Sequence, residues 1–212
     1  MPQLRRQPRQ TRARATFDAI LDAAAQLFAE HGYAATTTNR VAERAGVSIG
    51  SLYQYVSDKD ALLLALAERH LQEAADALSD TFRALHRDRP DVAETVRRLV
   101  ATLADLHRHD PAMHRLLFDQ TPRTPALAAR LRQAQRDLGR AVAAELIRLG
   151  VAGPHPQARA LLLVQGLEAQ VHGAVLEPPP DSSSAELIDE LIALWTTTLG
   201  HIGQGGAETR ID

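Results

Sequence analysis

The sequence predicts an all-α protein, and three observations support this fold class. Apolar residues recur at helical spacing along nearly the whole chain, no stretch reads as a strand, and the breaks between periodic stretches fall at glycine and proline. The 212 residues, of which 45% are hydrophobic and 24% charged, suffice for one large or two small globular domains. We expect a three-helix unit at the N-terminus followed by a larger helical body.

The composition argues against a disulfide-bonded, membrane-spanning or secreted protein. The chain has no cysteine, which excludes disulfide bonds and thiolate metal sites. No apolar run approaches the roughly 20 residues that a membrane-spanning helix needs. The basic N-terminus also lacks the apolar core of a secretory signal. We therefore expect a cytoplasmic protein with no membrane partner.

Basic residues gather at the N-terminal end. Residues 1–60 hold eight basic and six acidic groups, whereas the remainder holds sixteen basic and twenty acidic groups. Residues 1–15 contain no acid and are predicted to form a flexible basic arm. The arginines of this arm are Arg5, Arg6, Arg9, Arg12 and Arg14.

Three helices are predicted within residues 16–60. Gly32 is expected to end the first, while Thr37 and Ser48 are the expected N-caps of the second and third. The predicted boundaries are about 16–30, 38–45 and 49–56.

The second and third helices have the layout of a helix-turn-helix. About four residues join them, including Gly46, which can adopt the left-handed backbone of the turn. Val41, Val47, Leu52 and Val56 can face the first helix. The opposite face of the third helix then presents groups that can bond phosphates or base edges, which a helix serving only the core would not need. That face comprises Ile49, Gly50, Ser51, Tyr53, Gln54 and Tyr55.

Lys59 is the only lysine of the chain and falls in the first turn of the next predicted helix. A cation there is disfavoured by the helix dipole, by a few tenths of a kcal/mol. A DNA phosphate nearby would reverse that preference. The alternative is an exposed lysine supported by its neighbours Asp58 and Asp60.

A long fourth helix of about 28 residues opens the body, which is predicted to span residues 61–202. Residues 203–212 are predicted to form a disordered tail. Later helices are predicted at about 91–109, 124–149, 156–176 and 185–199. A further helix is predicted to begin at Pro111. Capping boxes start three of the body helices, at Ser57 with Asp60, Asp91 with Glu94, and Ser183 with Glu186.

The last two helices carry more apolar surface than one internal stripe needs. We expect them to pair with the same helices of a second copy in a four-helix bundle. The alternative is that this surface is core. The apolar positions are Leu161, Leu162, Val164, Gly166, Leu167, Val171, Leu187, Ile188, Leu191, Ile192 and Leu194.

Seven residues of the body are candidates to line a mostly apolar ligand pocket with a few polar anchors. Each has a plainer interpretation, because methionine and aromatic residues usually lie in cores, and histidine and glutamate are usually solvated. The candidates are Met113, His114, Leu117, Phe118, Glu168, His172 and Trp195.

Catalytic and metal sites are not predicted. His107, His109 and His114 lie close together beside Asp110, but their spacing follows no known zinc motif. The sequence shows no nucleophile with a matching base, no paired carboxylates and no phosphate-binding loop. We therefore predict no catalytic residue, metal or cofactor. A helical-body enzyme and an interaction protein that does not bind DNA remain the alternatives.

Residues 20–66, ILDAAAQLFAEHGYAATTTNRVAERAGVSIGSLYQYVSDKDALLLAL, resemble the DNA-binding domain of the TetR family of transcriptional regulators. The elements LF-x-E-x-G-Y, V-A-x-x-A-G-V-S, S-L-Y-x-Y and K-x-A-L-L occur in order with the family's spacing. The resemblance implies a homodimer that binds a near-palindromic operator and usually represses. It also implies a larger domain for dimerisation and for binding a small-molecule effector.

By matched position, the resemblance implies DNA contacts from both helices of the motif, and the basic arm would add salt-dependent affinity and reach the minor groove. Three positions are unusual. Arg40 stands where many relatives carry an acid, Val56 replaces the usual phenylalanine, and Ile49 offers only an apolar contact, for instance with a thymine methyl. The implied DNA-contacting residues are Thr38, Asn39, Arg40, Ser48, Ile49, Gly50, Ser51, Tyr53, Tyr55 and Lys59.

Overall fold

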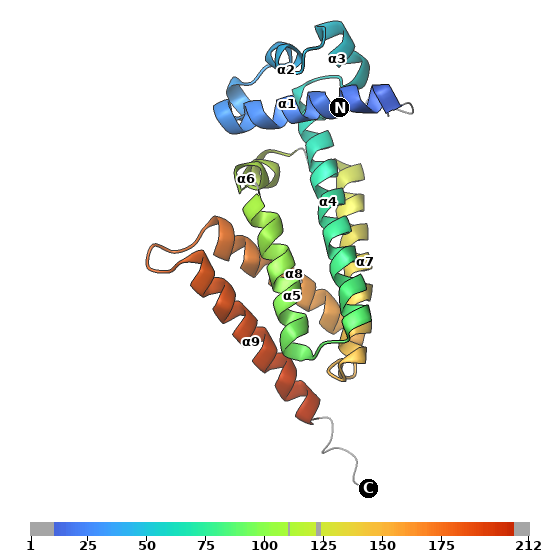
Figure 1. Cartoon of the computed structure of the whole chain (residues 1–212), viewed down its shortest axis with the longest axis vertical. Helices are drawn as coiled ribbons and strands as arrows, with labels where there is room; N and C mark the ends of the chain where they lie inside the picture. Colours follow the sequence, from blue (N-terminus) through green and yellow to red (C-terminus); the bar gives the residue numbers. More distant parts are fainter. Residues whose placement is uncertain (1–10, 110, 122–123, 206–212) are drawn as a thin grey trace. The chain divides into compact units, whose positions relative to one another are not determined.

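The computed structural model describes residues 11–109, 111–121 and 124–205, and these residues form helices joined by short connections (Figure 1). The predicted all-α fold class is confirmed. The helices of the described residues are α1 (Thr11–Ala35), α2 (Thr38–Arg44), α3 (Ile49–Tyr55), α4 (Lys59–Asp88), α5 (Val92–His109), α6 (Pro111–Gln120), α7 (Pro125–Arg148), α8 (Pro156–Leu176) and α9 (Ser184–Gly205). None of them combines the length and the apolar character that crossing a bilayer requires.

The chain divides into two units. The N-terminal unit comprises the described residues up to Gln72 together with Ala112–Ala128, and the C-terminal unit comprises Glu73–Pro111 and the residues from Ala129 onwards. This division differs from the predicted boundary after residue 60. The reason is that apolar residues from the start of α4 and from α6 pack into the same core as α1 to α3.

The core of the N-terminal unit forms where the inner faces of its helices meet. Val41, Leu52 and Val56, which were expected to face the first helix, are fully buried there, and Val47 is partly buried against them. Ile20 of α1 and Leu62 of α4 are fully buried in the same cluster. Burying such a side chain stabilises the fold by about 1.5–3 kcal/mol, so this core holds the helix-turn-helix in place.

The first helix departs from its prediction at both ends. It begins at Thr11 rather than residue 16, so Arg12 and Arg14 of the predicted flexible arm are helical; residues 1–10 of that arm lie outside the described residues. Gly32 interrupts the helix with φ +76° and ψ 163°, as expected of a stop signal, and a short helical segment follows to Ala35.

Side-chain caps start several helices where they were predicted. Thr37 accepts a hydrogen bond from Arg40 N, and Ser48 accepts one from Ser51 N. The prediction for α4 was wrong by one residue. Asp58, not Ser57, caps that helix, because its Oδ1 accepts from Ala61 N at 2.8 Å.

The two later caps start their helices where they were predicted, but only the one at Ser183 and Glu186 is a reciprocal capping box, because the Glu94 carboxylate accepts from Arg97 and Arg98. Asp91 Oδ1 accepts from Glu94 N at 2.9 Å. Ser183 Oγ accepts from Glu186 N at 3.2 Å, and Glu186 Oε2 accepts from Ser183 N at 2.8 Å. The last helix, α9, continues to Gly205, so residues 203–205 of the predicted disordered tail are helical; residues 206–212 lie outside the described residues.

In the C-terminal unit, α5 packs against α8 and α9, and α8 packs against α9 (Figure 1). Part of the apolar surface predicted for dimerisation belongs to this core, because Val164, Val171, Ile188 and Leu191 are buried within the unit. Three of the predicted residues remain exposed, and they are Leu161, Leu162 and Leu194.

Candidate functional site

The turn between α2 and α3 has the geometry that the helix-turn-helix requires. Gly46 has φ +68°, a left-handed conformation that favours glycine. Its N–H donates to the Glu43 carbonyl at 3.1 Å, and the N–H of Val47 donates to the Ala42 carbonyl at 3.0 Å. These bonds end α2 and direct the chain into α3.

The outer face of α3 carries apolar groups on its surface. Ile49 is 38% exposed and Tyr53 is 40% exposed, although both are large and apolar. Gly50 lies between them along the helix, and a Cβ added there would meet only Ser48 Oγ, at 3.8 Å. The fold therefore has room for a side chain at residue 50, so its packing does not require the glycine.

Hydroxyl groups of α2 and α3 are held in position by one another. Tyr53 Oη lies 3.1 Å from Thr38 Oγ1, which links α3 to the start of α2. Ser48 Oγ lies 2.8 Å from Ser51 Oγ and accepts from Ser51 N at 3.0 Å. The hydroxyl-bearing residues predicted to contact DNA therefore form two hydrogen-bonded pairs, Thr38 with Tyr53 and Ser48 with Ser51.

Other predicted contact residues differ in exposure. Asn39 and Arg40 are exposed at the start of α2. Tyr55 is half-buried, and its ring packs against Phe17 of α1 with 5.7 Å between ring centroids. The ring of Tyr55 thus belongs to the core of the N-terminal unit, and sequence reasoning missed this because the contact joins residues far apart in the chain.

Lys59 has partners that the sequence did not reveal. Its Nζ donates to the carbonyl oxygens of Tyr33 at 2.7 Å and Ala34 at 3.4 Å, and lies 4.2 Å from the centroid of the Tyr33 ring. The prediction that this lysine is badly placed without DNA was wrong. Carbonyls at the end of α1 attract its charge.

Tyr33 is itself fixed from the other side. Its hydroxyl donates to Asp60. Burial, together with this hydrogen bond and the negative charge of Asp60, raises the pKa of Tyr33 above its usual value. Tyr33, Lys59 and Asp60 therefore form one cluster that joins the end of α1 to the start of α4.

The C-terminal unit contains an apolar cavity of about 80 Å³. Leucine and valine form most of its wall. The remaining lining residues are Thr95, Glu145, Glu168 and Trp195. The leucines and valines are Leu78, Val96, Leu99, Val100, Leu103, Leu138, Val142, Leu146, Leu149, Leu163, Val164, Leu167 and Leu199.

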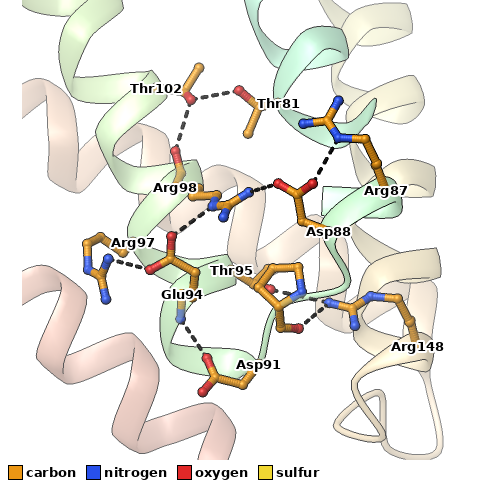
Figure 2. A network of polar contacts seen from close by, with 11 residues as sticks. Thr81, Arg87, Asp88, Asp91, Glu94, Thr95, Arg97, Arg98, Thr102 and Arg148 are labelled. Atoms are coloured by element: carbon orange, nitrogen blue, oxygen red, sulfur yellow. Dashed lines mark hydrogen bonds and ion pairs between the residues drawn. The ribbon is translucent and has the colours of Figure 1, made fainter. Parts of the chain in front are cut away.

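The negative charge of Glu145 is balanced by an ion pair with Arg148, which lies one turn further along α7. Arg148 Nε donates to Glu145 Oε1 at 2.8 Å, and this bond raises the pKa of Arg148. Arg148 Nη2 also donates to the carbonyl of Pro90 at 2.8 Å and lies 3.4 Å from Thr95 Oγ1. Figure 2 shows Arg148 reaching the connection between α4 and α5 in this way.

A network of ion pairs holds the same connection on its other side. Arg98 of α5 donates to Asp88 at 2.7 Å and to Glu94 at 2.8 Å, and Asp88 also accepts from Arg87 (Figure 2). These bonds lower the pKa of Asp88 and of Glu94. The network positions the start of α5, and this part of the helix supplies Thr95 and Val96 to the cavity.

Glu168 is the other acid of the cavity, and its side chain is 53% exposed. Its Oε1 lies 3.6 Å from Nε2 of the buried His107, whose Nδ1 is 2.8 Å from the Leu103 carbonyl. Because a carbonyl oxygen only accepts, Nδ1 of His107 is the donor in that bond. The ring of His172 packs edge-on against His107, with 5.8 Å between centroids.

Trp195 of α9 lies against α8. Its Nε1 donates to Gln170 Oε1 at 2.8 Å. A Cβ added at Gly166 would lie 3.5 Å from the indole ring, so the small residue leaves space for Trp195. This arrangement holds the indole in the wall of the cavity.

The structure brings two of the seven predicted ligand residues, Glu168 and Trp195, into the cavity wall. His172 contacts His107 but does not line the cavity. Met113 and Leu117 instead pack into the core of the N-terminal unit.

Two predicted ligand residues of α6 remain. Nδ1 of His114 lies 3.1 Å from Nε2 of His70, and both residues belong to the N-terminal unit. Phe118 lies in α6, but its side chain is outside the described part. Sequence reasoning missed the α5 and α7 walls, whose only signal was their amphipathic spacing.

Two family models match the chain. The model described as "Bacterial regulatory proteins, tetR family" matches residues 20–66, which contain the helix-turn-helix. The model described as "Tetracyclin repressor-like, C-terminal domain" matches residues 91–199, which contain the cavity.

The similar proteins include both an activator and a repressor of transcription. The chain is 35% identical over 116 residues to the HTH-type transcriptional activator FasR of Mycolicibacterium smegmatis, covering 54% of this chain and 51% of FasR. It is 34% identical over 130 residues to the repressor AcnR of Corynebacterium diphtheriae, covering 61% of this chain and 62% of AcnR. The matches thus span between half and two thirds of these relatives.

Solved structures share the fold. A TetR/AcrR family regulator from Thermobifida fusca is 18% identical and superimposes with a TM-score of 0.66, covering 86% of this chain and 96% of that one. SmeT in complex with triclosan is 25% identical, with a TM-score of 0.58, covering 85% of this chain and 91% of SmeT.

Proposed function

The chain belongs to the TetR family of bacterial regulatory proteins, and on that premise we propose that it regulates transcription by binding an operator as a homodimer and leaving it when a small molecule binds. The family and the relatives named above are regulators rather than enzymes. The observation that carries the proposal is the outer face of α3, where Ile49 and Tyr53 are exposed beside Gly50.

The proposed DNA contacts divide into two kinds. Thr38, Ser48, Ser51 and Tyr53 carry hydroxyls that suit phosphate oxygens and fix the register on the duplex. Ile49 has no hydrogen-bonding group, so it reads an apolar feature of the major groove such as a thymine methyl. Gly50 then permits close approach of the α3 backbone.

Further proposed DNA contacts come from charged and polar residues around the outer face of α3. Arg40 and Asn39 are exposed at the start of α2 and can reach phosphates. An ammonium group has three donors, and two of those of Lys59 point to α1 carbonyls. We assign the third donor of Lys59 to a phosphate, and the hydroxyl of the half-buried Tyr55 to the same backbone.

Dimerisation is assigned to α8 and α9. Leu162 is 68% exposed and Leu194 is 55% exposed, and Leu161 lies beside Leu162 on α8. Leucines this exposed on two adjacent helices favour burial against a second copy. A homodimer carries two recognition helices, one for each half-site of an operator whose half-sites lie about 34 Å apart.

The effector is assigned to the cavity of the C-terminal unit, because its leucine and valine wall suits a small, largely apolar molecule. SmeT, which shares the fold, binds triclosan in its solved complex. Relatives include an activator and a repressor; we propose repression, relieved by the effector, in the cytoplasm.

Selection of fragments from the source genome by the purified protein, at about 0.1 M salt, tests this proposal. We expect a two-fold-symmetric site with half-sites about one helical turn apart. Tyr53→Ala should weaken capture, whereas Arg132→Ala, which removes an exposed arginine of α7, should not. Failure of the folded protein to enrich any site, at lower salt as well, would refute DNA binding and favour an interaction protein.

A further inference from the structure

We infer that the cavity of the C-terminal unit takes an organic cation, a molecule with an apolar body and an amine or ammonium group that lies against Glu168. This inference rests on the proposed function, because it gives the chemical class of the proposed effector. It is drawn from the charges and geometry of the lining residues.

The charge of the cavity wall is negative. Among the described residues that line it, Glu145 and Glu168 are the acids, and none is a lysine, arginine or histidine. Glu145 is already paired with Arg148, and both side chains are nearly buried. Removing Arg148 from Glu145 would leave a buried charge uncompensated, so this pair stays intact. Of the two acids, Glu168, whose side chain is half exposed, is therefore the one that a charged ligand group at the edge of the cavity can contact.

Glu168 is suited to exchange partners. Its side chain is half exposed, so a ligand ammonium can replace water at the carboxylate. Its distance of 3.6 Å from His107 Nε2 is longer than a hydrogen bond. The bond from His107 Nδ1 to the Leu103 carbonyl holds the imidazole in place beside the carboxylate.

The lining gives the ligand a direction. On α8, Leu163, Val164 and Leu167 form an apolar stripe. One edge of this stripe is apolar and the other carries a charge. Trp195 packs over Gly166, and Glu168 follows two residues later, which is about 200° further around the helix. The indole and the carboxylate therefore lie at opposite edges of this stripe. A molecule that spans the stripe places its apolar body against the leucines and its charged end at Glu168.

The same wall disfavours anions. A carboxylate ligand would lose hydration in an apolar cavity whose lining offers no cation to receive it, and it would be repelled by Glu168. A neutral alcohol of the same length would bind through its apolar body alone. Three ligands with similar alkyl tails and a cationic, a neutral and an anionic head group therefore separate the possibilities.

Trp195 makes the test direct, because it is the single tryptophan of the chain and lies in the cavity wall. Its fluorescence is titrated with octyltrimethylammonium, octanol and octanoate, each below its micelle concentration, and calorimetry checks the affinities. We expect the cation to bind at least about tenfold more tightly than octanoate. Equal binding of the two ions, or tighter binding of octanoate, would overturn the inference.

Glu168→Gln removes the charge and keeps the shape of the side chain. Because Glu168 is half exposed, we expect this variant to bind the cation about three- to tenfold more weakly and octanol as before. Glu190→Gln, at an exposed acid of α9 outside the lining, serves as the matched control and should leave both affinities unchanged. Equal weakening of octanol and cation by Glu168→Gln would show a packing role instead and contradict the inference.

A separate assay follows release of a selected DNA fragment. Cation binding without DNA release would support the chemistry of the cavity and refute its role as the effector site. Release by octanoate or octanol but not by the cation would support the ligand-responsive regulator and overturn the cation inference.

Discussion

Arg44 of α2 holds Glu30 of α1 with two nitrogens, Nη1 at 2.9 Å from Oε1 and Nη2 at 2.8 Å from Oε2. Nη1 also lies 3.3 Å from Gln26 Oε1. A fork of two parallel hydrogen bonds fixes orientation as well as separation. It therefore sets the angle at which the first helix of the helix-turn-helix leaves α1.

The Glu30–Arg44 pair predicts an acid-dependent contribution to stability. The hydrogen bond from Arg44 lowers the pKa of Glu30 below its usual value. A lowered carboxyl pKa stabilises the folded chain above the unfolded value, and this contribution is lost as pH falls through the folded value. Glu30→Gln should lower the Tm by up to about 2 °C at pH 7. The difference from the parent chain should vanish in acid, as measured by thermal melts from neutral pH downwards.

The matched control for this prediction is Glu43→Gln, at an exposed acid of α2. We expect its Tm to follow that of the parent chain at every pH. A difference for Glu30→Gln that stays constant into strong acid would contradict the assignment of the effect to ionisation.

Local features of the fold were predictable from sequence because they depend on neighbours in the chain. The turn at Gly46 and the caps at Thr37 and Ser48 follow from residue types at fixed spacing, and the structure confirms them. The buried positions Val41 and Leu52 follow from helical periodicity. One-residue choices were less secure, since Ser57 and Asp58 are both good caps and only the folded geometry selects Asp58.

Contacts between distant residues were not predictable in the same way. Lys59 contacts Tyr33, which lies 26 residues earlier, and no local pattern signals that bond. Met113 has the character of either a pocket or a core residue, and tertiary packing places it in the core of the N-terminal unit. The cavity combines stripes from several helices, so its wall emerged only once their packing was known.

Lys59 and Arg40 are predicted to act differently although both are cations. Arg40→Ala should reduce DNA affinity and lower the slope of log K against log salt by about one, because one phosphate contact is lost. It should leave the Tm unchanged, since Arg40 is exposed at the start of α2. Lys59→Ala should lower both the slope and the Tm, because the variant also loses the bonds to the Tyr33 and Ala34 carbonyls. Equal Tm values for the two variants would refute the structural role of Lys59.

Dimerisation through α8 and α9 is tested by charging an exposed leucine. Leu162→Glu places a carboxylate in the proposed interface, and we expect the dimer to dissociate at least tenfold more readily in sedimentation equilibrium. The fold should persist, because Leu162 is exposed within its own unit. Leu131→Glu charges an exposed leucine of α7 and should leave the association unchanged. Equal dissociation constants for the two variants would exclude this face.

Gly46→Ala is predicted to destabilise the helix-turn-helix. The residue has φ +68°, where a side chain is strained even though nothing lies within 4 Å of an added Cβ. We expect a loss of about 1 kcal/mol in the free energy of unfolding, measured by urea denaturation. An unchanged unfolding midpoint would mean that the turn relaxes to a conformation with negative φ.

Gly50→Ala is the counterpart, and the same substitution should have the opposite effect on stability. Gly50 lies inside α3, and an added Cβ would make only an ordinary contact of 3.8 Å with Ser48 Oγ. Replacing a helical glycine by alanine at an unstrained site stabilises a protein by up to about 1 kcal/mol. Because the methyl group points from a surface proposed to approach DNA closely, operator affinity should fall by about tenfold or more. A variant that is more stable and binds the operator as tightly as the parent would show that the backbone at Gly50 does not approach DNA.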